Sequence, residues 1–194
     1  MAAALAITLA GCSSDDRSTQ DVSQPPRPFS ARFVERTDFN VEGERWRGTT
    51  RGAFDWDARE GWATERTEGL VTRTVQIGDR CFRRSGRGRW KESRAKDPEG
   101  TCSFALFQSP EHAFELLRQV ADLDEVGKER VRGAQTTRYR GSLSIGAVQG
   151  PIEVWVDDLG VVRRERQEGG DGGFVSTRDY FDFGVDVDVA PPRG

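Results

Sequence analysis

Hydrophobic and polar residues alternate along most of this chain, and the alternation has the two-residue period of β-strands. In the clearest segment, residues 137–145 place Thr, Tyr, Gly, Leu and Ile on one face and Arg or Ser on the other. The other segments predicted as strands are 46–57, 61–67, 71–77, 152–156, 161–167 and 181–189. Short turns such as 58–60 and 157–160 separate them. About nine strands at hairpin-like spacing therefore predict an antiparallel sheet.

One segment has the periodicity of a helix. Ser109, Pro110 and Glu111 combine a capping residue, a proline at the first helical position and an acid in the first turn. The apolar residues that follow recur at three- and four-residue intervals, which predicts an amphipathic helix over 109–123. Because the sheet is the only partner for its apolar face, the sequence predicts an α+β fold with this helix on one face of the sheet. The residues expected to meet between the two layers are Phe114, Leu117, Tyr139, Leu143, Val154, Phe181 and Phe183.

The N-terminus has the features of a bacterial lipoprotein signal. A short apolar run over residues 1–11 ends in Leu-Ala-Gly directly before Cys12, and small residues at this point suit a signal peptidase. The run is too short to span a bilayer, and no Lys or Arg precedes it, so the translation start stays open. The alternative is a stray apolar start with a buried cysteine. We predict a signal peptide over 1–11, a lipidated Cys12 with a polar, proline-containing tether over 12–28, and one β-rich domain over 29–194.

This reading places the protein at the extracytoplasmic face of a cell membrane, where thiols are oxidised. The two remaining cysteines, Cys81 and Cys102, are then expected to form a disulfide. The bridge would close a loop of roughly 20 residues and stabilise the fold by about 3 kcal/mol in the chain-entropy model. Two cysteines and the single histidine, His112, are too few ligands for a zinc site, so we expect no metal.

Composition narrows the function classes. Hydrophobic residues make up 35% of the chain, charged residues 31%, and the mean hydropathy is -0.67, which is polar for a folded domain. Eleven Phe and five Trp nevertheless argue against disorder. The net charge of -3 provides no general attraction for nucleic acid. His112 is expected on a helix surface, and no acid stands in a setting typical of a catalytic carboxyl, so we predict neither an enzyme nor a cofactor.

A basic stretch lies between residues 80 and 96, where aromatic side chains are interleaved with cations. One interpretation is contact with anionic lipid headgroups of the anchoring membrane. The other, which we favour, is a solvated hairpin around residues 85–88. The residues of the stretch are Arg80, Phe82, Arg83, Arg84, Arg87, Arg89, Trp90, Lys91, Arg94 and Lys96.

The second half of the chain resembles the LolA/LppX-type lipoprotein superfamily, including its LppX/LprAFG-like members. The similarity covers about residues 104–192 and depends on the order of several motifs: the strand sequence of 127–141, Pro-Ile-Glu-Val-Trp-Val-Asp at 151–157, and Tyr-Phe-Asp-Phe-Gly at 180–184 with a terminal Pro-Pro. The resemblance implies a half-barrel sheet with helices on its concave side. It also implies a space between sheet and helices that holds a lipid or the acyl chains of a partner, and it brings no catalytic residues.

The sequence is compatible with two function classes. The first is a membrane-anchored carrier or binding module for a lipid or an acylated partner, with the seven interlayer residues named above lining its ligand space. The second is a surface-anchored interaction or regulatory lipoprotein that has no ligand cavity and an unidentified protein partner. A dry apolar cavity would favour the first class, and a space filled by Trp and Phe side chains would favour the second.

Overall fold

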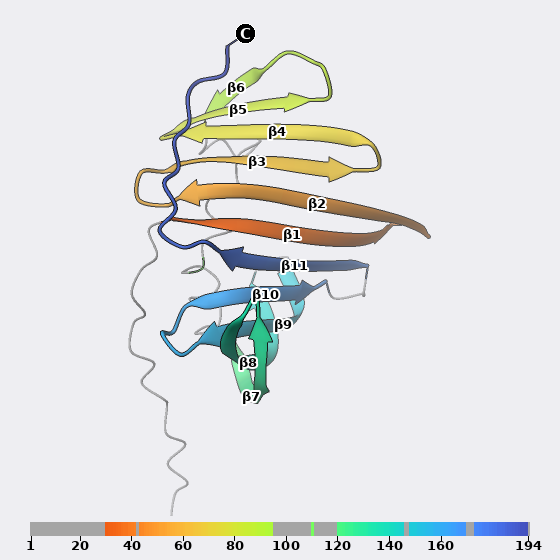
Figure 1. The fold of residues 1–194 in the computed structure, drawn as a ribbon. Coiled ribbons are helices and arrows are strands. Elements are labelled where there is room, and N and C mark those ends of the chain that lie inside the picture. The colour runs from red at the N-terminus through yellow and green to blue at the C-terminus, as the bar shows by residue number, and fades with distance from the viewer. Residues whose placement is uncertain are drawn as a thin grey trace, which may run out of the picture.

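A computed structural model describes residues 30–41, 43–94, 110, 120–145, 148–169 and 173–193 of this chain. Within them the backbone forms one curved, open, antiparallel sheet of 11 strands (Figure 1). The antiparallel sheet is confirmed, but the expected number of about nine strands is too low. The strands are β1 Ser30–Val41, β2 Glu44–Asp55, β3 Glu60–Thr67, β4 Leu70–Ile77, β5 Arg80–Ser85, β6 Lys91–Arg94, β7 Ala121–Val131, β8 Ala134–Ile145, β9 Val148–Asp157, β10 Val162–Glu168 and β11 Phe174–Phe181.

The sheet consists of two meanders that meet in its middle. The strand order is β6-β5-β4-β3-β2-β1-β11-β10-β9-β8-β7, so the first and last strands of the chain are neighbours. Their register places Phe33 of β1 opposite Tyr180 of β11. The C-terminal strand therefore joins the halves and leaves β6 and β7 at the two edges (Figure 1).

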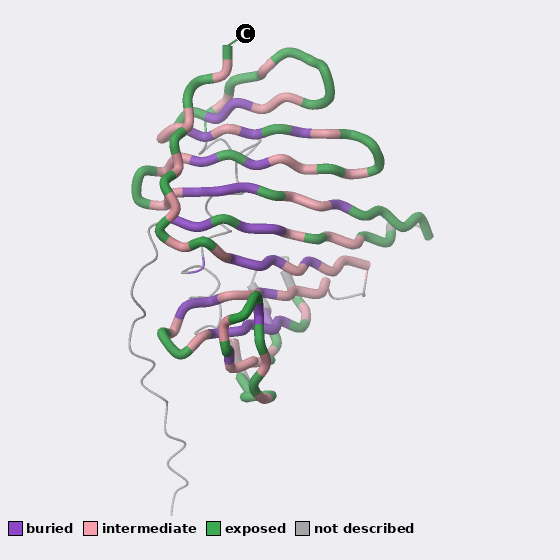
Figure 2. The backbone as a smooth tube through the Cα atoms, viewed as in Figure 1, coloured by how far each residue is buried: buried purple, intermediate pink, exposed green. Residues whose placement is uncertain are grey.

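The two faces of the sheet differ sharply in composition. One face, here called the core face, carries the buried apolar cluster Phe33, Ala63, Leu143, Ile152, Val154, Val156, Val162 and Tyr180. The opposite face, here called the arginine face, carries residues one position out of phase with these, such as Arg32, Arg51 and Arg164. Figure 2 shows the resulting alternation of buried and exposed positions along the strands. Any element that covers the apolar cluster must lie on the core face.

Two phenylalanines of the core face lie over glycines of the next strand. A Cβ at Gly52 would come within 2.7 Å of the Phe33 ring, and a Cβ at Gly61 within 2.1 Å of the Phe54 ring. Each ring thus occupies space that a side chain would need, a pairing that fixes strand register. Glycine suits these two core positions because the aromatic rings occupy the space that a side chain would fill.

The predicted helix over 109–123 falls mostly outside the described residues. Pro110 is helical and buried, whereas residues 111–119, including His112, Phe114 and Leu117, are not described. The C-terminal limit of the prediction is wrong, because Ala121–Val131 forms β7. Within the described part of the chain, no helix is long and apolar enough to cross a membrane.

The strand predicted over 181–189 is also wrong. Strand β11 ends at Phe181. Residues 182–193 form no strand, although half-buried and exposed positions still alternate along them. Asp182 and Gly184 adopt positive φ angles of 50° and 75°, which turn the chain out of the sheet. The Gly184 amide donates to the Ser30 carbonyl at 2.9 Å, and the Ser30 hydroxyl donates to the Val185 carbonyl at 2.6 Å. These bonds hold the C-terminal tail against the start of β1.

Candidate functional site

A group of charged side chains lies in the middle of the core face, where the two meanders join. Glu35 of β1 and Glu165 of β10 are both cross-strand partners of Arg178 on β11, so the three residues form one row across three strands. Arg178 Nη2 lies 2.8 Å from Glu35 Oε2, and their side chains are 7% and 13% exposed. Glu165 is 5% exposed. One carboxyl group therefore pairs directly with the guanidinium, and a second lies across from it on the neighbouring strand.

Neighbouring polar groups complete this cluster. The Ser176 hydroxyl donates to Glu35 Oε1 at 2.7 Å, and the Gln167 amide donates to Glu165 Oε1. Arg178 Nη1 donates to the Tyr180 hydroxyl at 3.5 Å. We call Glu35, Glu165, Gln167, Ser176, Arg178 and Tyr180 the buried polar cluster. Within it the buried Nε of Arg178 has no hydrogen-bond acceptor.

Burial and neighbouring charges set the ionisation of this cluster. Burial raises the pKa of Glu165, and the nearby Glu35 carboxyl adds to that effect, while Arg178 only partly offsets it. Burial opposes the charge on Arg178, but Tyr180, Glu35 and Glu165 outweigh burial and raise the pKa of the guanidinium. Burial also raises the pKa of the Tyr180 phenol. The surroundings therefore favour the neutral form of Glu165 beside the Glu35–Arg178 ion pair.

The arrangement suits binding better than catalysis. Arg178 can donate to an anionic or carbonyl oxygen, and a protonated Glu165 can donate as well as accept. The immediate neighbours are apolar: Val154 is the cross-strand partner of Glu165, and the Arg178 guanidinium carbon lies 5.9 Å from the centre of the Phe33 ring. A molecule held here would meet a polar centre surrounded by hydrocarbon. Among the described residues no group of three or more potential metal ligands occurs.

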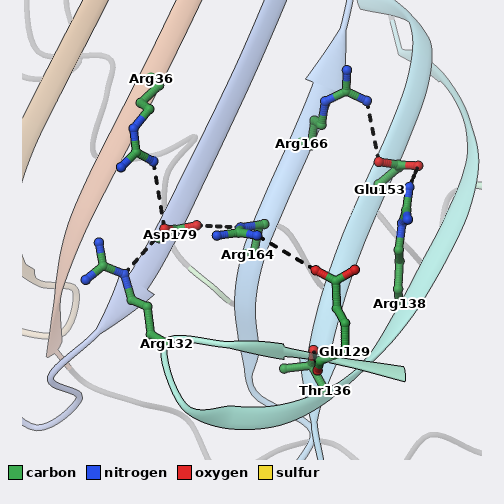
Figure 3. A network of polar contacts seen from close by, with 9 residues as sticks. All are labelled: Arg36, Glu129, Arg132, Thr136, Arg138, Glu153, Arg164, Arg166 and Asp179. Carbon is green, nitrogen blue, oxygen red and sulfur yellow. Dashed lines mark hydrogen bonds and ion pairs between the residues drawn. The ribbon is translucent and has the colours of Figure 1, made fainter. Parts of the chain in front are cut away.

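A second network lies on the arginine face (Figure 3). Asp179 is 3% exposed and contacts Arg164 at 2.6 Å, Arg132 at 3.3 Å and Arg36 at 3.9 Å. Arg164 also reaches Glu129 at 3.8 Å. These contacts tie β1, β7, β10 and β11 together.

Glu153 forms the other half of that network. It contacts Arg140 at 2.7 Å, Arg166 at 3.5 Å and Arg138. Burial alone would raise the pKa of Glu153, but hydrogen bonds from Arg138 and Arg140 outweigh it and hold the pKa below its usual range. Each buried acid of the arginine face has several arginines around it, so we interpret this network as structural.

Comparison with known sequences gives partial matches. No family model matches the chain. It is 31% identical over 123 residues to a candidate lipoprotein of Streptomyces coelicolor, a match that covers 58% of this chain and 43% of that protein. It is 29% identical over 111 residues to an uncharacterised 31.2 kDa protein of Streptomyces griseus, with 43% and 36% covered. The matches thus span about two fifths of the length of these curated relatives.

Comparison with solved structures covers nearly the whole chain. The lipoprotein LppX of Mycobacterium tuberculosis superimposes with a TM-score of 0.60 at 18% identity, covering 84% of this chain and 90% of LppX. The chain has the LppX fold. LprF of Mycobacterium bovis, with the same fold, gives a TM-score of 0.57 at 12% identity and covers 86% of this chain and 90% of LprF. The resemblance seen in the sequence is therefore confirmed for the fold.

The LppX-like sheet brings together several of the residues predicted to line a ligand space. Leu143 and Val154 belong to the core cluster, and Tyr139 and Phe183 pack against it. Burial, together with the Glu125 charge, raises the pKa of Tyr139. Phe181 departs from the expectation, because it follows Tyr180 directly on β11 and so lies on the arginine face. There the Arg132 guanidinium stacks over its ring at 3.9 Å.

The remaining predicted site residues are only partly described. Cys81 is fully buried on β5. Cys12, Cys102, Phe114 and Leu117 lie outside the described residues, so the lipidation site, the disulfide and the helix contribution stay predictions.

Sequence reasoning missed the buried polar cluster in this LppX-like sheet. Ser176, Arg178 and Tyr180 alternate along the chain and share one face, but polar residues at alternate positions normally indicate a solvent-facing side. A useful signal would have been the matching alternation of Phe33 and Glu35, which shows the same mixture of aromatic and charged residues.

Proposed function

We propose that this protein is a lipoprotein anchored through Cys12 to the extracytoplasmic face of a cell membrane, and that it binds a lipid or an acylated partner. The lipobox-like sequence before Cys12, the similarity to a candidate lipoprotein and the LppX fold support the anchored part of the proposal. Its bound molecule would lie on the core face.

The buried polar cluster carries the ligand part of the proposal. Charges inside a core that is purely structural can often be replaced by apolar residues without loss of stability. We therefore infer that the charged residues of this cluster have a role other than stability. Arg178 Nε has no acceptor among the described residues, and burial raises the pKa of Glu165, which favours the protonated form of its carboxyl group. An amphiphile would place its polar group at this cluster and its hydrocarbon against Phe33, Ile152 and Val154.

The alternative is a surface-anchored interaction or regulatory lipoprotein without a ligand space. The Phe33 and Phe54 rings lying over Gly52 and Gly61 favour this alternative, because they occupy volume directly above the sheet. A hydrophobic fraction of 35% also suits a thin, filled core.

The experiment is mass spectrometry of lipids extracted from protein purified from its own membrane, combined with thermal unfolding before and after extraction. A carrier should release a defined lipid, and unfolding after extraction should occur at a lower temperature. Arg178→Met should reduce the amount of bound lipid, whereas Arg130→Met, on an exposed position of β7, should leave it unchanged.

Substitutions at Leu117 separate the two functions further. If the layers pack directly, Leu117→Ala costs roughly 2–5 kcal/mol of stability, and Leu117→Trp overpacks the core. If a lipid fills the space, Leu117→Ala costs less, and Leu117→Trp selects shorter chains. Absence of co-purifying lipid, no stabilisation by added lipid and a large loss for Leu117→Ala together would contradict the carrier function and leave the interaction protein.

A further inference from the structure

The arginine face of strands β2–β5 is strongly cationic. Strand register places seven arginines and two acids on it. The arginines are Arg45, Arg47, Arg51, Arg66, Arg73, Arg80 and Arg84, and the acids are Asp55 and Glu60. The chain as a whole has a net charge of -3, so this face is a local reversal of the overall charge.

Some of these arginines form ion pairs with acids of the same chain. Arg45 and Arg47 share Asp38 at 2.5 Å and 3.6 Å, and Arg80 pairs with Glu92 at 2.8 Å. These ion pairs lie at the strand ends and at the edge of the sheet. In the described strands β2–β5 the middle of the face contains no acid.

The central arginines of this face differ from Arg45, Arg47 and Arg80. Arg51, Arg66 and Arg73 are exposed and form no ion pair with any residue in the described part of the chain. Arg73 lies directly opposite Arg84 across the β4–β5 pair, and Arg51 is two strands away in the same row, with Thr64 between them. Like charges in direct cross-strand positions destabilise a sheet. An anion placed between the guanidinium groups would remove that repulsion.

A half-exposed tryptophan lies in the row next to this arginine row. Trp62 is 39% exposed, and its cross-strand neighbour on β4 is Val75. A half-exposed tryptophan next to arginines is typical of side chains at a membrane–water interface, where the ring meets hydrocarbon and the guanidinium groups meet phosphates. The arginines come from four neighbouring strands, so they can contact several headgroups at once.

We propose that this face of β2–β5, centred on Arg51, Arg66, Arg73 and Trp62, docks on the anionic phospholipid surface of a membrane. The proposal rests on the membrane location given under the proposed function, and it is independent of the ligand on the core face. Residues 12–30 span at most about 60 Å when fully extended, so a chain attached through Cys12 can present this face to the bilayer. Docking would orient the sheet, which the anchor alone does not do.

The test uses the full-length chain with Cys12→Ser, so that acylation contributes nothing to binding. Sedimentation with vesicles of phosphatidylcholine and phosphatidylglycerol in equal parts should remove the protein from solution, and pure phosphatidylcholine vesicles should not. Arg51→Gln with Arg73→Gln should weaken binding about 30-fold, from a roughly five-fold effect per arginine. Binding should also decrease as salt is raised, because the contacts are exposed.

The matched control is Lys128→Gln with Arg130→Gln, which removes the same charge from exposed positions of β7 at the opposite edge of the sheet. The control should bind nearly as tightly as the parent. Equal binding to both kinds of vesicle, equal losses in the two double variants, or selective binding of a soluble polyanion without vesicle binding would overturn the proposal. Palmitate labelling of the wild-type chain tests the anchor separately, so failure of docking and failure of the lipoprotein assignment are distinguishable.

Discussion

Two buried glutamates on neighbouring strands form a matched pair for testing how this sheet handles internal charge. Glu153 on β9 and Glu165 on β10 are 4% and 5% exposed, and they lie on opposite faces of the sheet. Substitution by Gln removes the charge and keeps the size of either side chain. Because the two pKa values are shifted in opposite directions, we expect opposite effects on stability.

Glu153→Gln should destabilise the protein. A hydrogen bond to a charged group contributes about 1.5–3 kcal/mol, and breaking a fully buried ion pair costs about 3–5 kcal/mol. Two of the partner arginines, Arg138 and Arg140, have side chains 26% and 55% exposed and can regain water. We therefore expect a loss of about 2–3 kcal/mol at neutral pH. The loss should shrink as the pH falls through the lowered pKa of Glu153, where the wild-type carboxyl also becomes neutral.

Glu165→Gln should be neutral or stabilising. The folded state favours the protonated carboxyl, so this group stabilises the fold most below the ordinary carboxyl pKa, and that contribution is lost as the pH rises toward the raised value. Gln lacks this titration, and its amide oxygen can still accept the hydrogen bond from Gln167. The variant should therefore gain relative to wild type as the pH increases.

Urea unfolding followed by tryptophan fluorescence, carried out from about pH 3 to 8, measures both effects, because the lowered pKa of Glu153 and the raised pKa of Glu165 lie on opposite sides of the ordinary carboxyl value. With a urea slope of about 2 kcal/mol/M, the loss for Glu153→Gln corresponds to a midpoint lower by roughly 1 M. Equal losses in the two variants would refute the reasoning. So would a loss of more than about 2 kcal/mol for Glu165→Gln at neutral pH, because the carboxylate would then be charged and needed.

Three further predictions concern other parts of the molecule. Cys12→Ser should release the protein from membranes and abolish palmitate labelling, and firm retention of the variant would contradict the anchor. Mass mapping without reduction should link Cys81 to Cys102, and losing the bridge should cost about 3 kcal/mol, whereas two free thiols in envelope-derived protein would contradict it. Gly61→Ala should lower stability by about 1–3 kcal/mol in thermal unfolding, because its Cβ would lie 2.1 Å from the Phe54 ring, and a neutral result would contradict that packing.

Sequence patterning predicted the strands in which hydrophobic residues line one face. Residues 137–145 behave as expected: β8 covers Ala134–Ile145, with Tyr139 and Leu143 directed to the core face. The hairpin of 46–57 with 61–67 and the turn at 157–160 are also found, the latter with Asp157 accepting hydrogen bonds from the Leu159 and Val161 amides.

Sequence patterning assigned the wrong face where tertiary contacts bury polar residues and leave apolar residues on the arginine face. In β4 the buried positions are Thr72, Thr74 and Gln76, while the valines lie on the arginine face, so hydrophobicity alone assigns the wrong side. In β11 Arg178 is flanked by Glu165 from the preceding strand and by Glu35 from β1, which is far away in sequence. No local rule contains that information. The site was therefore not predictable from the sequence, although most of the sheet was.

The seam between β1 and β11 has a consequence for how the chain reaches this fold. Ser176 and Glu35, which are hydrogen bonded across it, are 141 residues apart along the chain. The β1–β6 meander can form from local hairpins, but β1 stays an unprotected edge until the last strand arrives. Closing the seam is a step of high contact order, and it also brings the Arg178 guanidinium between its two carboxyl groups. Folding intermediates should therefore expose β1 and aggregate through it, and slow refolding should depend more on β11 than on any hairpin.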